Sequence, residues 1–395
     1  MQFDRRQFLT TSLSASAAPM FVPRRAWGAN DKLSYALIAA GGRGRYVNRE
    51  FQKLGAKCVA ICDVYEPYIE KALEDSPDAK TYTDYQELLD KEKSIDFTIL
   101  AGPDHHHCPM LLASLAAGKD AYAEKPLSKS LAESQTMIQA VKKSDRIVQI
   151  GMQRRSAPVI RSAKRLVDDG VLGKLSMVKA VWNWNIARQL DNSPLPGKLD
   201  WKRFLGSAPA RDLEPMRFRS WRYFWDYAGG NMTDQGTHLM DVVQWFTNSA
   251  PPVSAMCNGQ VRKMIGAEHP EVFSTIFEFP DFMATWTLNY CNSYDNGWSI
   301  TFMGDKGTLV LDDGGYSVYQ EPWAVPKNRT PIYFAKVSVP LDAHVQNFLD
   351  CVKSRQQPNC SVETAAQAVA GPHLANISLK TGRKVKLASD LVTVS

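Results

Sequence analysis

Between Lys32 and Gly151 the chain alternates short apolar runs with segments that repeat apolar residues at helical spacing. The runs LSYALIAAG, KCVAICD and SIDFTILAG are typical of buried strands, and RYVNREFQKL and PMLLASLAAG, which follow two of them, are typical of helices. Strands that alternate with helices form βαβ units, and such units build a parallel sheet with helices on its faces. Residues 32–151 are therefore predicted to form an α/β domain.

The pattern changes after Gly151. LSMVKAVWNWN predicts one long strand with alternating faces. The segments that begin at Phe273 and Trp298 predict hairpins, which turn at 280–281 and at 304–307. Long antiparallel strands of this kind predict a large, open, mostly antiparallel sheet, so residues 152–395 are expected to form a second domain of the α+β class.

The turn after the first predicted strand reads AAGGRGR and begins at Ala39. Aligned with the dinucleotide fingerprint G-x-G-x-x-G, it places Ala39, Gly41 and Gly44 at the three glycine positions. Gly41 lets the backbone approach a pyrophosphate, Gly44 lets the helix pack on the strand, and Ala39 predicts a slightly less tight turn. The free amides at the helix start, over Gly42 and Arg43, would bind the phosphates. The first domain is therefore expected to be a Rossmann-type nucleotide-binding domain.

Asp63 closes the second predicted strand about 20 residues further on, where a carboxylate accepts hydrogen bonds from ribose hydroxyls. The same carboxylate repels a 2′-phosphate, which favours NAD, whereas Arg43 and Arg45 favour NADP. The alternative interpretation is that Asp63 caps the helix that begins near Pro67.

The stretch GPDHHHCP, residues 102–109, follows the third predicted strand at its carboxyl end, where a parallel sheet binds its ligand. Three adjacent side chains cannot all point at one ion, and nothing at a suitable spacing completes a ligand set, so no metal site is predicted. Pro103 and Asp104 are interpreted as the loop under the nicotinamide ribose, with one or two histidines, His107 among them, lining the cofactor cleft. The alternative is that the histidines cap a helix that Pro109 begins.

The chain starts with a twin arginine followed by an apolar, Ser/Ala-rich run that is too short and polar to anchor in a bilayer. Residues 1–29 are predicted to be a twin-arginine signal peptide, which would send the mature protein to the periplasm and limit its membrane contact to the export machinery. The alternative is the basic start of a cytoplasmic protein. The formal net charge is +6, half of it in residues 1–29, and the scattered remainder argues against nucleic acid as a partner.

Two motifs, AEKPLSKSLAE and GGNMTDQGTHLMDVVQW, resemble the Glu-Lys-Pro and Asp-x-x-x-His signatures of the Gfo/Idh/MocA oxidoreductases. The resemblance covers essentially all of the chain after the signal, and is greatest to the exported, sugar-directed branch that includes glucose–fructose oxidoreductase. It implies that His238 exchanges a proton with the substrate and that Asp234 positions the substrate. It places Lys125 and Glu124 beside the nicotinamide, and it implies a homo-oligomer formed through the broad face of the second sheet.

The residue types suit this chemistry. Hydride transfer from a C–H group to nicotinamide needs a base for the proton of the adjoining hydroxyl, and histidine titrates near neutral pH. Asp234 precedes His238 by four residues, so both can face one cleft from one helix. Lys125 is the alternative acid/base if burial and the positive ring of the cofactor lower its pKa. The structural alternatives are a surface lysine before a turn and a histidine that only caps the core.

The stretch MRFRSWRYFWDY, directly before the Asp-x-x-x-His motif, interleaves arginines with aromatic residues. Sugar rings offer flat C–H faces to aromatic rings and hydroxyls to guanidinium donors, so this composition suits a carbohydrate. An anionic sugar such as a uronic acid is the alternative ligand, and core packing explains half of the aromatics but explains Arg217 and Arg219 less well. The predicted substrate-binding residues, besides Asp234, are Arg154, Trp182, Arg188, Trp221, Arg222 and Tyr223.

These features predict a periplasmic NAD(P)-dependent oxidoreductase that transfers hydride between a sugar hydroxyl and a nicotinamide cofactor. The second hypothesis is a glycoside-cleaving enzyme that oxidises a sugar hydroxyl transiently, eliminates the glycosidic substituent and reduces the product back. The third is a sensor that binds a sugar or nucleotide without turnover. Because the periplasm holds little free nicotinamide cofactor, NAD, or NADP in its place, is expected to stay bound through turnover.

Overall fold

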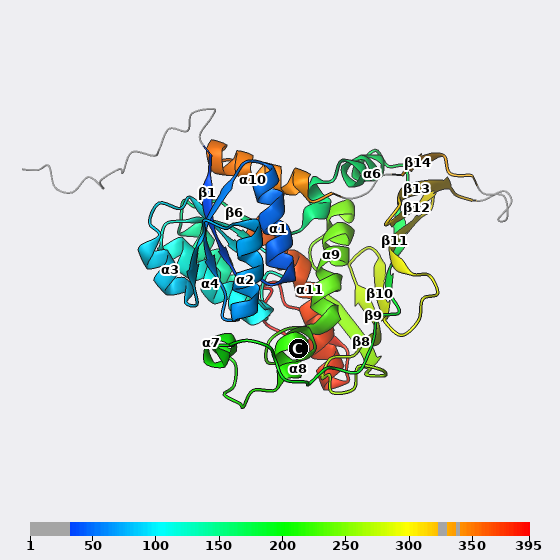
Figure 1. The fold of residues 1–395 in the computed structure, drawn as a ribbon. Coiled ribbons are helices and arrows are strands. Elements are labelled where there is room, and N and C mark those ends of the chain that lie inside the picture. The colour runs from blue at the N-terminus through cyan, green and yellow to red at the C-terminus, as the bar shows by residue number, and fades with distance from the viewer. Residues whose placement is uncertain (1–31, 323–329, 337–339) are drawn as a thin grey trace, which may run out of the picture. The chain divides into compact units, whose positions relative to one another are not determined.

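The computed structural model describes residues 32–322, 330–336 and 340–395, and residues 33–395 belong to one structural unit (Figure 1). The predicted signal peptide, residues 1–29, lies outside the described residues. Among the helices of the described ranges, none combines the length and the apolar character that crossing a lipid bilayer requires.

A six-stranded sheet with the strand order β3-β2-β1-β4-β5-β6 confirms the predicted Rossmann-type parallel sheet. Its strands are Ser34–Ile38 (β1), Lys57–Cys62 (β2), Lys80–Tyr82 (β3), Phe97–Leu100 (β4), Asp120–Ala123 (β5) and Val148–Ile150 (β6). The helices between them are Gly42–Lys53 (α1), Glu66–Asp75 (α2), Tyr85–Lys91 (α3), Asp104–Ala116 (α4) and Leu131–Lys142 (α5). Most strand residues are buried, as expected for a parallel sheet that helices cover on both faces.

Adjacent residues of β1 point to opposite faces of this sheet, and each face has its own core. Ala36 packs toward α3 and α4. Tyr35 faces α1 and stacks on Phe97, with ring centroids 5.0 Å apart. On this second face Phe348 of α10 (Asp342–Ser354) lies 5.8 Å from Phe51 and 5.1 Å from Phe97. A helix from late in the chain therefore completes the core of the first sheet.

Helix α4 begins at Asp104, so the prediction that Pro109 starts this helix was wrong. Pro109 lies inside α4 and cannot donate to the carbonyl of His105. The amide of His105, which is in the first turn of α4 and has no acceptor within the helix, donates to the carbonyl of Tyr227, at 3.0 Å. A contact from the second half of the chain thus holds a first turn that the local sequence disfavours.

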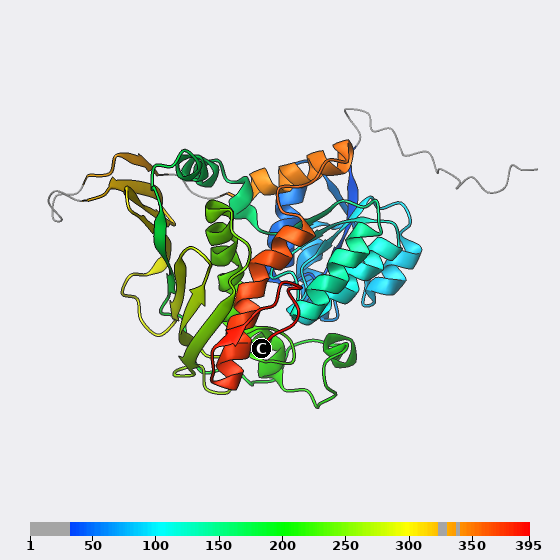
Figure 2. The ribbon, with the colours of Figure 1, turned by 180° about the vertical axis from the view of Figure 1, so that it is seen from behind.

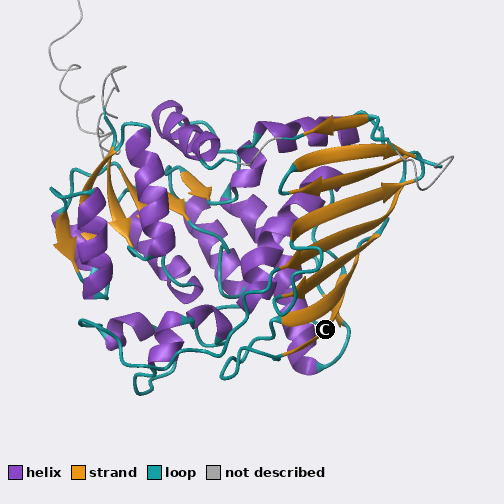
Figure 3. Ribbon diagram, turned by 45° about the vertical axis from the view of Figure 1, so that its right-hand side comes forward, coloured by secondary structure: helices purple, strands orange, loops and turns teal. Residues whose placement is uncertain are grey.

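A nine-stranded sheet with the order β14-β13-β12-β11-β7-β10-β9-β8-β15 confirms the predicted large, mostly antiparallel sheet (Figure 3). Its strands are Leu175–Asn183 (β7), Ser254–Gln260 (β8), Val272–Glu278 (β9), Met283–Asn289 (β10), Gly297–Gly304 (β11), Gly307–Asp312 (β12), Gly315–Gln320 (β13), Tyr333–Ala335 (β14) and Val385–Lys386 (β15). The two predicted hairpins are β9–β10 and β11–β12. In the described sheet only β7 and β10 pair in parallel.

Helices cover one face of the second sheet. Pro158–Asp168 (α6), Gly230–Thr247 (α9) and Val362–Thr381 (α11) pack their apolar residues against it, and α9 and α11 lie side by side (Figure 2). The strands alternate buried and exposed residues, as β9 does from Val272 to Glu278, so the opposite face is open.

The segment between β7 and α9, residues 184–229, crosses to the first sheet. It contains the short helices α7 (Trp201–Leu205), α8 (Pro215–Arg219) and η2 (Trp221–Tyr223). Leu199 forms an antiparallel bridge with Tyr65, which follows β2, and the amide of Glu66 donates to the carbonyl of Lys198 at 2.9 Å. A small core that includes Tyr65 and Phe204 seals the contact. This β7–α9 segment therefore belongs structurally to both halves of the unit.

Candidate active site

The turn between β1 and α1 has the geometry of a nucleotide-binding glycine loop. A Cβ atom at Gly44 would lie 2.1 Å from the carbonyl oxygen of Ala39, so only glycine fits there and α1 starts close against β1. Ala39 itself takes a φ of 71°, in the left-handed region that glycine favours. The prediction of a less tight turn was wrong: the turn is tight, and the alanine is strained at a cost of about 1–2 kcal/mol. The first amides of α1 have no intrahelical acceptor, which suits a phosphate.

Asp63 braces this turn. Its Oδ2 accepts a hydrogen bond from the amide of Ala40 (2.6 Å) and its Oδ1 accepts one from the amide of Tyr65 (2.9 Å). Burial raises the pKa of this carboxyl to about 6. Tyr65 is the N-cap residue of α2, so Asp63 does not cap that helix. The carboxylate lies at the end of β2, where the fingerprint requires its ribose-binding acid.

A cleft of about 880 Å³ opens beside the carboxyl ends of β1, β2 and β4, where the strand order reverses on either side of β1. The β7–α9 segment forms its other wall. From the first half of the chain the lining includes Gly41, Gly42, Arg43, Asp63 and Pro103. From the β7–α9 segment it includes Lys202, Arg203, Arg219, Trp221 and Arg222. Free amides, basic side chains and a ribose-side carboxylate fit a dinucleotide.

The three adjacent histidines hold backbone segments together. The Nε2 atoms of His105 and His106 both lie at hydrogen-bond distance from the carbonyl oxygen of Phe204, at 2.9 and 2.7 Å. His107 contacts the carbonyls of Pro126 and Gly102 through its two ring nitrogens, at 2.7 and 2.8 Å, so it has no free nitrogen for the cofactor that it was predicted to contact. Of the three, His106 lines the cleft. In the described residues no group of His, Cys, Asp and Glu side chains is arranged to hold a metal ion.

Lys125, Asp234 and Arg222 form one charged cluster. Lys125 Nζ donates to Asp234 Oδ1 and, at 2.9 Å, to the backbone carbonyl of the same residue. Arg222 Nε lies 3.5 Å from Asp234 Oδ2. Burial alone would raise the pKa of Asp234, but the charges of Lys125 and Arg222 outweigh burial and lower the pKa to about 2. The carboxylate is therefore ionised at any physiological pH.

His238 lies one turn after Asp234 on α9 and is buried. Burial, followed by the charges of Lys125, Arg154 and Arg43, lowers its pKa well below 6.5. Its Nδ1 has no hydrogen-bond partner among the described residues. The imidazole is thus neutral at pH 7 and has a nitrogen free to exchange a proton.

Two further predicted residues stand beside this cluster. Asp104 is buried at the start of α4, and burial, followed by the charge of Asp234, raises its pKa to about 7. Glu124 directly follows β5 and pairs with Arg43, whose Nη2 lies 2.9 Å from Glu124 Oε1. The guanidinium of Arg43, which also lines the cleft, is therefore held at the carboxyl end of β5.

The predicted substrate-binding residues lie in three different places. Near the cluster lie Arg222, whose guanidinium stacks 4.2 Å from the Trp221 ring centroid, and Tyr223, whose pKa burial and the charge of Asp234 raise to about 12. Arg154 and Trp182 are both buried, and the guanidinium carbon of Arg154 lies 5.4 Å from the ring centroid of Trp182. Arg188 is exposed and donates only to the carbonyl of Ile186, so the described structure does not bring it to the site.

Arg217 and Arg219, which belong to the stretch whose composition suits a sugar, fix the β7–α9 segment instead. Arg217 pairs with Glu214 at 3.0 Å and with Glu268 at 2.9 Å. Arg219 Nη2 donates to the carbonyl of Pro194 at 3.0 Å. These arginines stabilise an irregular segment whose backbone has few regular hydrogen bonds.

Several polar groups near the cluster were not predicted. Buried atoms without a hydrogen-bond partner in the described ranges include Asn231 Nδ2, Gln235 Oε1, Thr237 Oγ1 and Tyr290 Oη. Asn231 and Gln235 lie three residues before and one residue after Asp234, so helical spacing within the motif already places Asn231 on the face of Asp234 and His238. No local sequence pattern predicts Tyr290. It directly follows β10, and its hydroxyl lies near enough to Asp234 and Arg222 for their charges to act on its pKa.

The fold and the site together define a two-part dinucleotide-binding protein in which a buried cluster of Lys125, Asp234 and His238 lies next to the nucleotide cleft. Two family models match: "Oxidoreductase family, NAD-binding Rossmann fold" over residues 33–152 and "Oxidoreductase family, C-terminal alpha/beta domain" over residues 164–387. The chain belongs to the Gfo/Idh/MocA oxidoreductase family.

Inositol 2-dehydrogenase of Salmonella typhimurium is 33% identical over 126 residues, which span 31% of this chain and 37% of that enzyme. The chain thus matches little more than a third of that relative's length. Among solved structures, levoglucosan dehydrogenase in complex with NADH and levoglucosan has a TM-score of 0.72 at 16% identity, over 90% of this chain and 99% of that one. Aldose-aldose oxidoreductase from Caulobacter crescentus, complexed with glycerol, has a TM-score of 0.69 at 19% identity, over 90% and 100% of the two chains. Both structures share the fold.

Proposed function

We propose that this protein is an NAD(P)-dependent oxidoreductase that transfers hydride between a CH–OH group of a sugar or sugar derivative and a nicotinamide cofactor. The observation that carries the proposal is a neutral, buried His238 one helical turn from Asp234, whose carboxylate holds Lys125 at the end of β5. Relatives named inositol and levoglucosan dehydrogenases support a polyol or sugar as the substrate class.

In the oxidative direction the neutral His238 receives the hydroxyl proton. Lys125, which Asp234 keeps in place, donates a hydrogen bond to the same oxygen and stabilises the negative charge that develops there. Asn231 and Tyr290 supply unpaired polar atoms for the other hydroxyls. A nicotinamide cofactor, when bound in the cleft, supplies the hydride acceptor.

The test is oxidation of a panel of sugars and inositols by the mature protein with NAD and with NADP, followed by reduced nicotinamide and by identification of the carbonyl product. Release of the aglycone from glycosides would favour the glycoside-cleaving alternative. Binding of nucleotide and sugar without any product would overturn the proposal and leave a sensor.

We further propose that the cofactor is NAD and that it stays bound through turnover. Asp63 at the end of β2 supports NAD. Retention is supported by the β7–α9 segment, because the bridge between Leu199 and Tyr65 fastens one wall of the cleft to the other. Persistence through purification requires a dissociation constant of roughly nanomolar or below, about −12 kcal/mol. Protein purified without added cofactor and then denatured should release near-stoichiometric NAD; an empty protein would refute retention.

The twin arginine and the apolar run of residues 1–29 support a proposal of export to the periplasm. Cell fractionation of the wild-type protein and of a variant with Arg5→Lys and Arg6→Lys tests it. The wild-type protein should appear in the periplasm and the variant should stay in the cytoplasm. Equal distribution of the two proteins would contradict export by this route.

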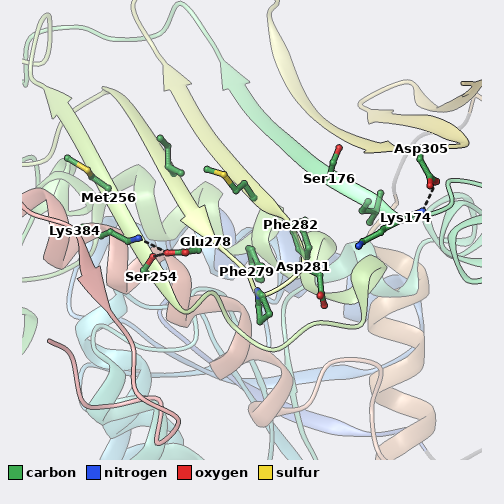
Figure 4. A pocket seen from close by; sticks show the side chains of 14 residues that line it. Lys174, Ser176, Ser254, Met256, Glu278, Phe279, Asp281, Phe282, Asp305 and Lys384 are labelled. Atoms are coloured by element: carbon green, nitrogen blue, oxygen red, sulfur yellow. Dashed lines mark hydrogen bonds and ion pairs between the residues drawn. The ribbon is translucent and has the colours of Figure 1, made fainter. Parts of the chain in front are cut away.

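We also propose that the open face of the second sheet joins two copies of the chain. Met256, Ile276 and Met283 are 54%, 46% and 47% exposed on this face, around a hollow of about 770 Å³ that Phe279 and Phe282 help to line (Figure 4). Neighbouring exposed apolar side chains on a broad face are typical of protein interfaces. Light scattering should give a homo-oligomer that Ile276→Lys dissociates; a monomeric wild-type protein would refute the proposal.

A further inference from the structure

Arg154 is a buried cation that forms no direct ion pair with a carboxylate of the described residues, although Asp313 and Asp241 lie near enough to act on its charge. It lies in the short helix η1 (Gln153–Ser156), is 5% exposed, and its guanidinium carbon is 3.7 Å from the ring centroid of Trp298 and 5.4 Å from that of Trp182. Its Nη1 has no hydrogen-bond partner within the described part of the chain. Nearby Asp241 is already paired with Arg155, at 2.7 Å.

Burial lowers the pKa of Arg154 to about 9, and the charges of Asp313 and Asp241 offset burial only in part. The guanidinium therefore keeps its charge at neutral pH although it has left water. A buried charge of this kind is costly unless a partner compensates it, and removal of one partner from a buried pair is strongly destabilising. The described protein residues leave that compensation incomplete.

The surroundings add further positive charge. The single carboxylate of Asp234 pairs with two cations, Lys125 and Arg222. Helix η1, which carries Arg154, packs against α9, which carries His238, and the neighbouring Arg155 pairs with Asp241 one turn after His238. After burial, the charges of Lys125 and Arg154 are the largest causes that lower the pKa of His238. Asp104, the remaining carboxyl of the cluster, has a pKa of about 7 and is only partly ionised at neutral pH. An oxidised nicotinamide ring would add one more positive charge.

We propose that the substrate is a sugar acid whose carboxylate pairs with the guanidinium of Arg154. The proposal rests on the proposed oxidoreductase function and narrows its substrate class. A guanidinium can donate two parallel hydrogen bonds to a carboxylate, and the flanking indole rings of Trp182 and Trp298 exclude water from such a pair. The carboxylate does not react: a CH–OH group elsewhere on the sugar becomes C=O, its hydride goes to the nicotinamide cofactor, and the hydroxyl proton goes to His238.

The experiment compares neutral and acidic sugars that differ only at one carbon: glucose with glucuronate, and galactose with galacturonate. kcat/KM is measured for each with the holoenzyme of the wild-type protein, Arg154→Met and Arg161→Met. Arg161 is an exposed arginine on α6 and serves as the matched control. The wild-type protein should prefer the acid of at least one pair on the order of 100-fold, since loss of one partner from a buried charge pair has effects of this size.

Arg154→Met should remove most of that preference, Arg154→Lys should restore part of it, and Arg161→Met should keep it. A wild-type preference for the neutral member of both pairs would overturn the sugar-acid proposal and leave the oxidoreductase function intact. Equal losses for acid and neutral sugars in Arg154→Met would also overturn it. No product from any sugar would instead contradict the oxidoreductase function.

Thermal unfolding gives a readout that does not depend on turnover. Methionine keeps the length of the side chain and removes the uncompensated charge, so Arg154→Met should unfold at the wild-type temperature or above it. Millimolar glucuronate should raise the unfolding temperature of the wild-type protein and not that of Arg154→Met. Equal stabilisation of both proteins by glucuronate would place its carboxylate elsewhere and overturn the assignment.

Discussion

Replacement of Asp234 by Asn removes the carboxylate that holds Lys125 and leaves a side chain of nearly the same shape. The pKa of Asp234 is about 2 in the folded protein against an ordinary value of 3.8. A difference of this size corresponds to about 2 kcal/mol of stability from the ionised form. Asp234→Asn should therefore lower the free energy of unfolding by about 2 kcal/mol at pH 7.

The pH dependence distinguishes this electrostatic loss from a packing defect. A carboxyl whose pKa is lowered by folding stabilises the protein fully above its unfolded pKa and loses that contribution as the pH falls through its folded pKa. The difference between the wild-type protein and Asp234→Asn should thus be constant above about pH 5, shrink below about pH 4 and vanish only below about pH 2, where the folded carboxyl is protonated.

The assay is urea unfolding of both proteins, followed by tryptophan fluorescence, at a series of pH values from 7 down to the lowest at which both fold. Asp281→Asn, at the exposed turn between β9 and β10, is the matched control and should track the wild-type protein. A difference for Asp234→Asn that stays the same between pH 7 and pH 3 would refute the reasoning, because a contact without charge does not titrate.

Four other substitutions test the site. His238→Asn should reduce turnover on the order of 100- to 10,000-fold while NAD binding in a titration stays nearly unchanged, and a loss below threefold would favour Lys125 as the base. Gly44→Ala should abolish cofactor binding, because its Cβ would lie 2.1 Å from the carbonyl oxygen of Ala39. Ala39→Gly should raise the free energy of unfolding by about 1 kcal/mol, because glycine adopts the left-handed conformation without strain. An Ala39→Gly protein that is less stable than the wild-type protein in urea unfolding would contradict this. Asp63→Ala should weaken NAD relative to NADP in titrations of nucleotide-free protein, and an unchanged preference would reduce Asp63 to its bracing role.

Local motifs carried most of what the sequence could predict. The βα alternation, the glycine loop and the two hairpins depend on residues close together in the chain, and the structure has all three. The residues Asp234 and His238 are four apart on one helix, so their proximity also follows from the sequence. Lys125 comes from a distant strand end, and its predicted place beside them depended on the family resemblance.

Errors arose where contacts between distant segments decide the outcome. The sequence around residues 105–107 is that of an ordinary helix start. It does not indicate that the carbonyl of Phe204, about a hundred residues later in the chain, bonds to His105 and His106. Arg217 and Arg219 have the composition of a sugar site, but Glu268 and the carbonyl of Pro194, which hold them, lie 51 and 25 residues away in the chain. Trp298 was not predicted because only the folded sheet brings it to Arg154.

The place of α10 has a consequence for the order in which the protein forms during synthesis. Phe348 packs on Phe51 and Phe97, and the β7–α9 segment forms one wall of the nucleotide cleft. A nascent chain that has been synthesised only as far as the end of the first sheet still lacks part of the core of that sheet and one wall of the cleft. The core of the first sheet is therefore complete only once α10, residues 342–354, has left the ribosome, so a domain that the first 150 residues encode finishes folding late in synthesis.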